Sequence, residues 1–166
     1  LPVLQKIEEI DFAGVDLAFC ALPHATSQAV IAALPRTLKI VDLSADFRLR
    51  DPAVYAKAYG HTHPHPELLG EAVYGLTEHA RERVAAARLV ANPGCYPTGA
   101  LALLRPLVDA GLIPADYPVT INAVSGYSGG GKAMIEAYES GKAPAFELYG
   151  LGLTHKHLPE TQLHAG

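Results

Sequence analysis

The chain has 166 residues, of which 49% are hydrophobic and 18% charged, and its formal net charge is −4. This composition is ordinary for a soluble domain that is long enough to bury a sizeable core. A negative charge without any Lys/Arg run disfavours nucleic acid and anionic membranes as partners. No apolar run is long enough to cross a bilayer and no signal peptide opens the chain. The composition, with only two cysteines, is typical of a cytosolic protein, so we expect a cytoplasmic location.

Apolar, strand-like runs alternate with helical patterns in the first half of the chain. The predicted strands are 17–22, 38–43 and 89–91, and the predicted helices are 24–34, 52–59 and one that begins at Thr77. Such alternation is typical of βαβ units. The sequence therefore predicts an α/β fold with a partial Rossmann-type, doubly wound parallel sheet.

The second half of the chain has a different pattern, which predicts part of an α+β catalytic domain. We expect a helix from Pro97 to about Ala110 with a kink at Pro106, a strand at 119–124, and a helix near 132–139. A domain boundary near Gly94 and Cys95 divides the chain into the C-terminal part of a dinucleotide-binding domain (1–94) and the N-terminal part of a catalytic and dimerisation domain (95–166). No Gly-x-Gly-x-x-Gly turn precedes Leu17, so the sequence is expected to be the middle of a longer protein.

Cys95 is the first candidate for chemistry, because it lies where the predicted strand 89–91 gives way to a helix. Unpaired N–H groups and the helix dipole at a helix N-terminus favour a thiolate, which is the nucleophilic form. The alternative is a small buried cysteine in a turn. Cys20 lies within an apolar run and is expected to be core. Two such cysteines do not form a disulfide framework.

A glycine-rich segment, 125–132, is the second candidate, because it contains four glycines, two serines and Lys132 between a predicted strand and a predicted helix. Small residues let backbone N–H groups approach an anion, so the segment is predicted to bind a phosphate. Its glycine spacing differs from a Walker A motif. The alternative is a flexible surface loop.

Histidines and one arginine complete the candidates. His155 and His157 can exchange protons near neutral pH, and Glu160 can orient one of them. A metal site that adds His164 has little support, and the histidines at 61–65 are expected in a solvated loop. Arg48 follows a predicted strand and is either a clamp for a carboxylate or phosphate or an ordinary salt-bridge residue.

Four motifs together resemble the N-acetyl-γ-glutamyl-phosphate reductases, which are related to aspartate-semialdehyde dehydrogenase. They are Ala-Leu-Pro-His (21–24), Asp-Leu-Ser-Ala-Asp-Phe-Arg-Leu (42–49), Asn-Pro-Gly-Cys-Tyr-Pro-Thr-Gly (92–99) and His-Lys-His-Leu-Pro-Glu (155–160). The resemblance runs from about residue 16 to residue 166. It implies an enzyme of arginine biosynthesis that reduces N-acetylglutamyl 5-phosphate with NADP(H).

The resemblance also implies roles for individual residues. Cys95 attacks the acyl phosphate and forms a thioester, and His157 or His155 is the acid/base, with His157 favoured because it is nearer to Glu160 along the chain. The cofactor-binding candidates are Ala21, Leu22, Pro23, His24, Ser125, Gly126 and Gly129, and the substrate-binding candidates are Arg48, Ser128 and Lys132. We expect no bound metal. We expect the protein to form a homo-oligomer.

Three other functions stay open at this point. A related reductase of lysine biosynthesis shares the chemistry and differs in the length of its acyl phosphate. A cysteine hydrolase using Cys95 and His157 needs no nucleotide, and a non-catalytic binding module needs neither residue. Because the N-terminal glycine fingerprint is absent, residues 1–166 alone are expected not to turn over substrate.

Overall fold

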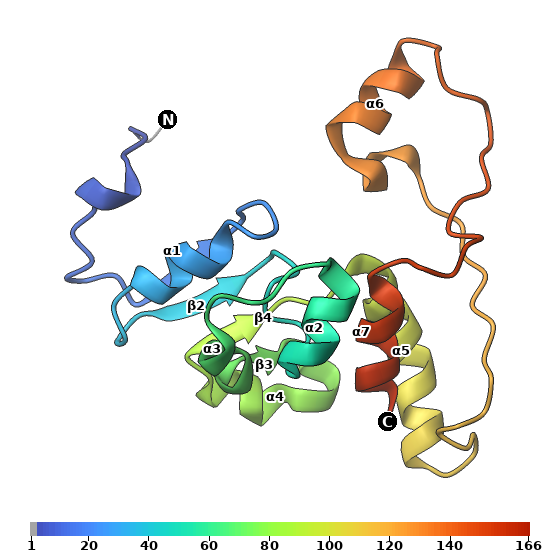
Figure 1. Ribbon diagram of the computed structural model, residues 1–166, viewed down its shortest axis with the longest axis horizontal. Coiled ribbons are helices and arrows are strands. Elements are labelled where there is room, and N and C mark those ends of the chain that lie inside the picture. Colours follow the sequence, from blue (N-terminus) through green and yellow to red (C-terminus); the bar gives the residue numbers. More distant parts are fainter. Residues whose placement is uncertain (1–2) are drawn as a thin grey trace.

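A four-stranded parallel sheet forms the centre of the first half of the chain. The computed structural model describes residues 3–166. Its strands are β1 (Leu17–Cys20), β2 (Lys39–Asp42), β3 (Val73–Tyr74) and β4 (Leu89–Ala91), in the order β1-β2-β4-β3. Every neighbouring pair is parallel. The predicted α/β fold with a parallel sheet is therefore confirmed (Figure 1).

Four helices connect these strands, after a short 3-10 turn, η1 (Ile7–Glu9), near the start of the chain. They are α1 (Ser27–Ala33), α2 (Pro52–Tyr59), α3 (Pro66–Glu71) and α4 (Thr77–Ala86). Proline at the first helical position starts α2 and α3. The sequence patterns did not predict α3 or β3, because six and two residues are too short to show a period.

The core lies between the sheet and its covering helices. Ile40 and Leu89 from the sheet, Ile31 from α1, Tyr55 from α2 and Leu69 from α3 are fully buried. Removing such side chains from water supplies most of the free energy that holds the layers together. Cys20 is also buried, as expected of a core residue.

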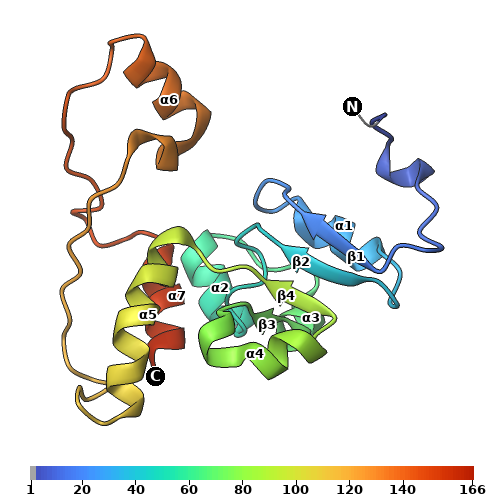
Figure 2. The ribbon, with the colours of Figure 1, turned by 180° about the vertical axis from the view of Figure 1, so that it is seen from behind.

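Two helices of the second half, α5 (Cys95–Asp109) and α7 (His157–Ala165), pack against each other. Both views show them side by side with their N-terminal ends at the same end of the pair (Figures 1 and 2). Pro97 lies in the first turn of α5, where its missing N–H costs nothing, and Pro106 lies inside the helix. This arrangement brings Cys95 and His157 to neighbouring helix ends although 62 positions separate them in the chain.

The segment between α5 and α7 is extended and carries the 3-10 turn η2 (Tyr127–Gly130) and α6 (Gly131–Glu139) away from the sheet (Figures 1 and 2). The predicted strand at 119–124 is wrong, since these residues form no strand. Ile121 and Val124 are exposed instead. An alternating pattern produces a strand only where a second strand pairs with it, and none does so within residues 3–166.

Within the same described range, no helix combines the length and the hydrophobicity that crossing a bilayer requires.

Candidate active site

Three loops that carry the quoted motifs meet at one edge of the sheet. Residues 21–24 follow β1, residues 43–48 follow β2 and residues 92–95 follow β4. Because the strands are parallel, their carboxyl ends lie along the same edge, which is where ligands bind in open α/β sheets. The fold thereby collects most of the predicted site residues.

Cys95 is the first residue of α5 and its side chain is exposed. It forms no disulfide, and neither does Cys20. The alternative of a buried structural cysteine therefore does not hold for Cys95. An accessible thiol at the N-terminus of a helix is placed where it can reach a bound substrate as a nucleophile.

His157 is the first residue of α7 and packs against the residue that precedes the thiol. A Cβ placed on Gly94 would lie 2.7 Å from the His157 Nε2 atom and 3.0 Å from the Arg48 Nη1 atom. Only glycine therefore lets the imidazole lie this close to the start of α5. Burial lowers the pKa of His157, against the opposing effect of the Glu160 charge. The ring is thus neutral at neutral pH, and one of its nitrogens can accept a proton.

His155 lies just outside the helix and supports its first turn. Its Nδ1 atom accepts a hydrogen bond from the His157 backbone N–H at 3.1 Å, and the two ring centroids are 4.5 Å apart. His155 is exposed, whereas His157 is partly buried. The two imidazoles are therefore adjacent but differ in environment.

Glu160 is fully buried and has a different set of partners from the one predicted for it. Its carboxylate accepts from the Gly94 N–H at 2.7 Å and from the Tyr74 hydroxyl at 2.7 Å, and lies 3.4 Å from Arg48 Nη1. It forms no hydrogen bond with His155 or His157, so the expectation that it orients a histidine directly is corrected. A buried carboxylate needs strong donors, and these three groups supply them.

Arg48 is buried beneath the same loop, with 7% of its surface exposed. Besides its ion pair with Glu160, its Nη2 atom donates to the Leu43 carbonyl at 3.1 Å. Of the two predicted roles, the salt bridge is present. The Nε atom is buried and has no hydrogen-bond partner among residues 3–166.

A cavity of about 210 Å³ lies beside the two helix ends. Among its lining residues are Tyr96, Ile121, Tyr149, His155 and His157. The Tyr149 hydroxyl donates to the Tyr96 hydroxyl, and this bond raises the pKa of Tyr149 to about 12. The cavity therefore combines an apolar wall with two imidazoles and two phenols.

The sequence patterns did not point to Tyr74, Tyr96 or Tyr149. Tyr96 adjoins Cys95, which was a usable signal, but Tyr149 lies 54 positions away in an unpatterned stretch. Tyr74 belongs to the unpredicted β3. Contacts between residues this distant in sequence have no local periodicity to indicate them.

The structure divides the glycine-rich segment. Ser125 lies near the Tyr149 phenol and so near the cavity, whereas Gly126 and Gly129 belong to the turn that leads to α6. Ser128 and Lys132 are exposed on the outlying α6 arm and do not line the cavity. The role of the glycine-rich segment 125–132 in phosphate binding stays a prediction.

The loop of Ala21, Leu22, Pro23 and His24 lies at the carboxyl end of β1, beside Asp46. The Asp46 carboxylate is fully buried, contacts His24 Nδ1 and accepts from the Ala25 N–H at 3.0 Å and the Ser27 hydroxyl at 2.7 Å. These bonds hold Ala25 at a φ of 67°, in the left-handed region. The His24 Nε2 atom is buried without a partner among residues 3–166. A rigid loop with an unpartnered polar atom at this edge fits a nucleotide cofactor.

The histidines near residue 61 are not in a solvated loop, so that expectation is wrong. His63 is buried and packs edge-on against Phe47 and Tyr55, and His61 Nε2 lies 3.2 Å from the Tyr55 hydroxyl. Aromatic neighbours that are remote in sequence hold these rings. Within residues 3–166, no group of three or more His, Cys, Asp or Glu side chains is arranged to hold a metal.

Two family models match the chain. The model described as the semialdehyde dehydrogenase NAD binding domain matches residues 2–87, and the semialdehyde dehydrogenase dimerisation domain matches residues 95–166.

Similar curated proteins are named N-acetyl-gamma-glutamyl-phosphate reductase. The protein from Cereibacter sphaeroides strain KD131 is 56% identical over 161 residues, which is 96% of this chain and 47% of that protein. The proteins from Jannaschia sp. strain CCS1 and Ruegeria pomeroyi are each 53% identical over the same shares. The chain thus spans about half the length of the curated relatives it matches.

Proposed function

Because the chain belongs to the semialdehyde dehydrogenase family, we propose that it carries the nucleophile and the acid/base of an N-acetylglutamyl 5-phosphate reductase. The reaction converts this acyl phosphate, NADPH and a proton into N-acetylglutamate 5-semialdehyde, phosphate and NADP⁺, as a step of arginine biosynthesis. The observation that carries the proposal is the packing of His157 against Gly94, directly before the exposed Cys95 at the start of α5.

Cys95 is the proposed nucleophile. Its thiolate attacks the acyl carbon, the bond from that carbon to the phosphate oxygen breaks, and phosphate leaves. The product is a thioester on Cys95. When bound, a nicotinamide cofactor supplies the hydride that such a thioester needs to become an aldehyde.

His157 is the proposed acid/base, and three observations favour it over His155. Its Nε2 atom is on the side of Gly94, its lowered pKa keeps it neutral, and its Nδ1 atom is free of any hydrogen bond from residues 3–166. A neutral imidazole here takes the thiol proton before attack and gives it to the departing phosphate, and a proton from solvent restores the thiol when the aldehyde is released. His155 then positions His157 by accepting its backbone N–H.

Glu160 and Arg48 act as positioning residues in this proposal. The Glu160 carboxylate holds the Gly94 N–H, which fixes the backbone one residue before the nucleophile. Arg48 neutralises that buried carboxylate and keeps one unpartnered Nε–H near the same loop. This Nε–H supports retaining Arg48 as a substrate-binding candidate.

The cofactor is proposed to bind along the carboxyl edge of the sheet. Residues Ala21, Leu22, Pro23 and His24 follow β1 there. Ser125, Gly126 and Gly129 are retained as cofactor-binding predictions, although the segment that carries them runs away from the sheet (Figure 1). The family model supports a nicotinamide cofactor, and NADP(H) in particular is part of the proposal.

The domain division and the assembly are proposals as well. A boundary near Gly94 and Cys95 separates residues 1–94, which include the sheet, from residues 95–166, which include α5 and α7. A match to a dimerisation domain supports a homo-oligomer. A cytoplasmic location stays a prediction.

The test inserts this chain in place of the matching segment of the Cereibacter sphaeroides relative, so that the full family length is present. The hybrid is expected to reduce NADP⁺ with N-acetylglutamate 5-semialdehyde only when phosphate is added. A Cys95→Ser change abolishes the rate, and Cys20→Ala, in the core, is the matched control.

Three outcomes contradict the proposal. They are a folded hybrid without phosphate-dependent activity, a Cys95→Ser variant that keeps full activity, and a preference for the longer semialdehyde of the lysine branch. Ester hydrolysis without any nicotinamide assigns a cysteine hydrolase instead.

A further inference from the structure

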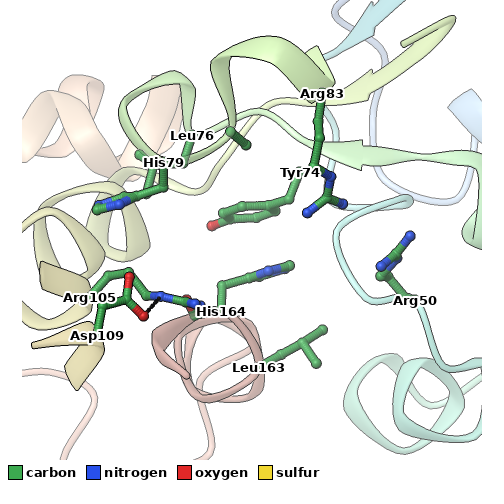
Figure 3. Close-up of a pocket in the computed structure, with 10 residues that line it drawn as sticks. Arg50, Tyr74, Leu76, His79, Arg83, Arg105, Asp109, Leu163 and His164 are labelled. Atoms are coloured by element: carbon green, nitrogen blue, oxygen red, sulfur yellow. Dashed lines mark hydrogen bonds and ion pairs between the residues drawn. The ribbon is translucent and has the colours of Figure 1, made fainter. Parts of the chain in front are cut away.

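A second cavity, of about 310 Å³, lies between α4, the C-terminal halves of α5 and α7, and the loop after Leu49. Figure 3 shows guanidinium groups and the rings of Tyr74, His79 and His164 around it. Cys95, His155 and His157 are not among its lining residues. It is therefore separate from the candidate active site, and we call it the Arg50–Arg83 pocket.

The charge around this pocket is unbalanced. Arg50, Arg83 and Arg105 line it together with a single carboxylate, that of Asp109. Asp109 is already engaged by Arg105 at 2.8 Å, and Arg105 Nη1 also donates to the His164 carbonyl at 3.3 Å. No such partner is found for Arg50 or Arg83 among residues 3–166.

This lack of partners separates Arg50 and Arg83 from most arginines of the chain. Arg36 and Arg88 both pair with Glu71, and Arg48 pairs with Glu160. A guanidinium carries five N–H donors in a planar fork that matches a phosphate or carboxylate. The pocket therefore offers two complete sets of donors to an anion.

One wall of the pocket is a stacked pair of rings, Tyr74 on His164. The centroids are 3.6 Å apart and the planes are 14° from parallel. The Tyr74 hydroxyl is held by Glu160, and His164 Nε2 lies 3.0 Å from the Arg48 carbonyl. Both rings are thus fixed from behind by buried groups.

The stacked rings carry no charge at neutral pH. Burial raises the pKa of Tyr74 and lowers the pKa of His164. The wall therefore neither cancels nor adds to the positive charge of the arginines, and it offers a flat surface for an organic group.

We propose that the Arg50–Arg83 pocket binds a small organic phosphate monoester. The phosphate is held by the two unpaired guanidiniums, whose planar donors suit its charge and its oxygens. The organic part lies against the Tyr74–His164 stack. A volume of about 310 Å³ is at the lower end of the range for small-molecule sites, which suits a ligand larger than free phosphate.

Phenyl phosphate is the probe, titrated into the chain by isothermal calorimetry at about 0.15 M salt, where surface charges are screened. Saturable binding is expected. Because the Arg50→Ala/Arg83→Ala double variant loses the charged donors of both guanidiniums, it is expected to bind at least roughly a hundredfold more weakly. Neither guanidinium forms an ion pair within residues 3–166, so the folded state loses none in this variant.

Arg81→Ala is the matched control, since Arg81 is exposed on the same helix but does not line the pocket. It is expected to leave the affinity unchanged, and the single Arg83→Ala change to weaken it by an intermediate factor. Inorganic phosphate is expected to bind more weakly than phenyl phosphate, because it cannot contact the rings.

Several results overturn the proposal. Equal weakening by Arg81→Ala indicates unspecific attraction. Loss of binding after alkylation of Cys95 assigns the anion to the candidate active site. Equal affinities for inorganic and phenyl phosphate remove the role of the ring stack, and absence of saturable binding removes the site.

Discussion

At the scale of single residues, Glu160 connects the two halves of the chain. It belongs to α7, yet its partners are Tyr74 from β3, Gly94 before α5 and Arg48 after β2. The motif that contains it was visible in the sequence, and so was its charge. Its actual partners were not, because they lie 66 to 112 positions away in the chain.

Replacing Glu160 by Ala is expected to destabilise the fold by about 3–5 kcal/mol, because it leaves the buried Arg48 charge and two donors unpaired. Glu160→Gln keeps the acceptor oxygen for Gly94 and Tyr74 and is expected to cost less. Urea denaturation measures both changes, with Glu139→Ala on the exposed face of α6 as the control. A loss no larger than that of the control contradicts the anchoring role.

Replacing Gly94 by Ala tests whether the contact between Gly94 and His157 matters for the reaction. Its φ of −64° suits any residue, so Gly94→Ala introduces no backbone strain. The added Cβ instead displaces His157 or Arg48, and we expect the hybrid enzyme to lose about tenfold to a hundredfold in rate while it stays folded.

Gly99→Ala is the control for this change, since Gly99 lies in the same helix with open space around it. That substitution is expected to stabilise α5 by roughly 0.5–1 kcal/mol and to leave the rate unchanged. Equal rates for the two variants contradict the proposed contact.

At the scale of elements, the accuracy of the predictions depends on how clearly the sequence marks the boundaries of an element and on whether the folded chain supplies the contacts that the element needs. The predicted helix at 52–59 and the predicted strand at 89–91 match α2 and β4, because each has clear boundaries in the sequence. The helix predicted at 24–34 begins later, at Ser27, because Asp46 holds residue Ala25 in a non-helical conformation. Residues 119–124 form no strand, because no other strand within residues 3–166 pairs with them.

Asp51 is expected to determine where α2 begins. Its carboxylate accepts from the Ala53 N–H at 2.7 Å, which satisfies a donor that the helix itself leaves free. Asp51→Ala is expected to cost about 1 kcal/mol in the free energy of unfolding. Asp116→Ala, at an exposed position, is the control, and an equal effect on both contradicts the capping role.

At the scale of the whole molecule, the histidines respond to pH together. Burial lowers the pKa of His24, His63, His157 and His164 below the ordinary value near 6.5. Below that value the unfolded chain binds more protons than the folded one, so stability is lost as pH falls.

The urea midpoint is therefore expected to be lower at pH 5.5 than at pH 7.5. Asp42, whose pKa burial raises, acts in the opposite direction at lower pH, so the comparison stops at pH 5.5. His164→Gln is expected to reduce the difference, whereas His79→Gln, at an exposed position, leaves it intact. A midpoint that rises toward pH 5.5 contradicts this account.

The central claim is that Cys95 carries the acyl group during the reaction. The most direct measurement mixes the hybrid protein with N-acetylglutamyl 5-phosphate in the absence of any nicotinamide and locates the modification by peptide mass spectrometry. The expected result is one equivalent of released phosphate and one hydroxylamine-sensitive acyl group on the Cys95 peptide. An acyl group on another residue, or unchanged phosphate release from Cys95→Ser, contradicts the claim.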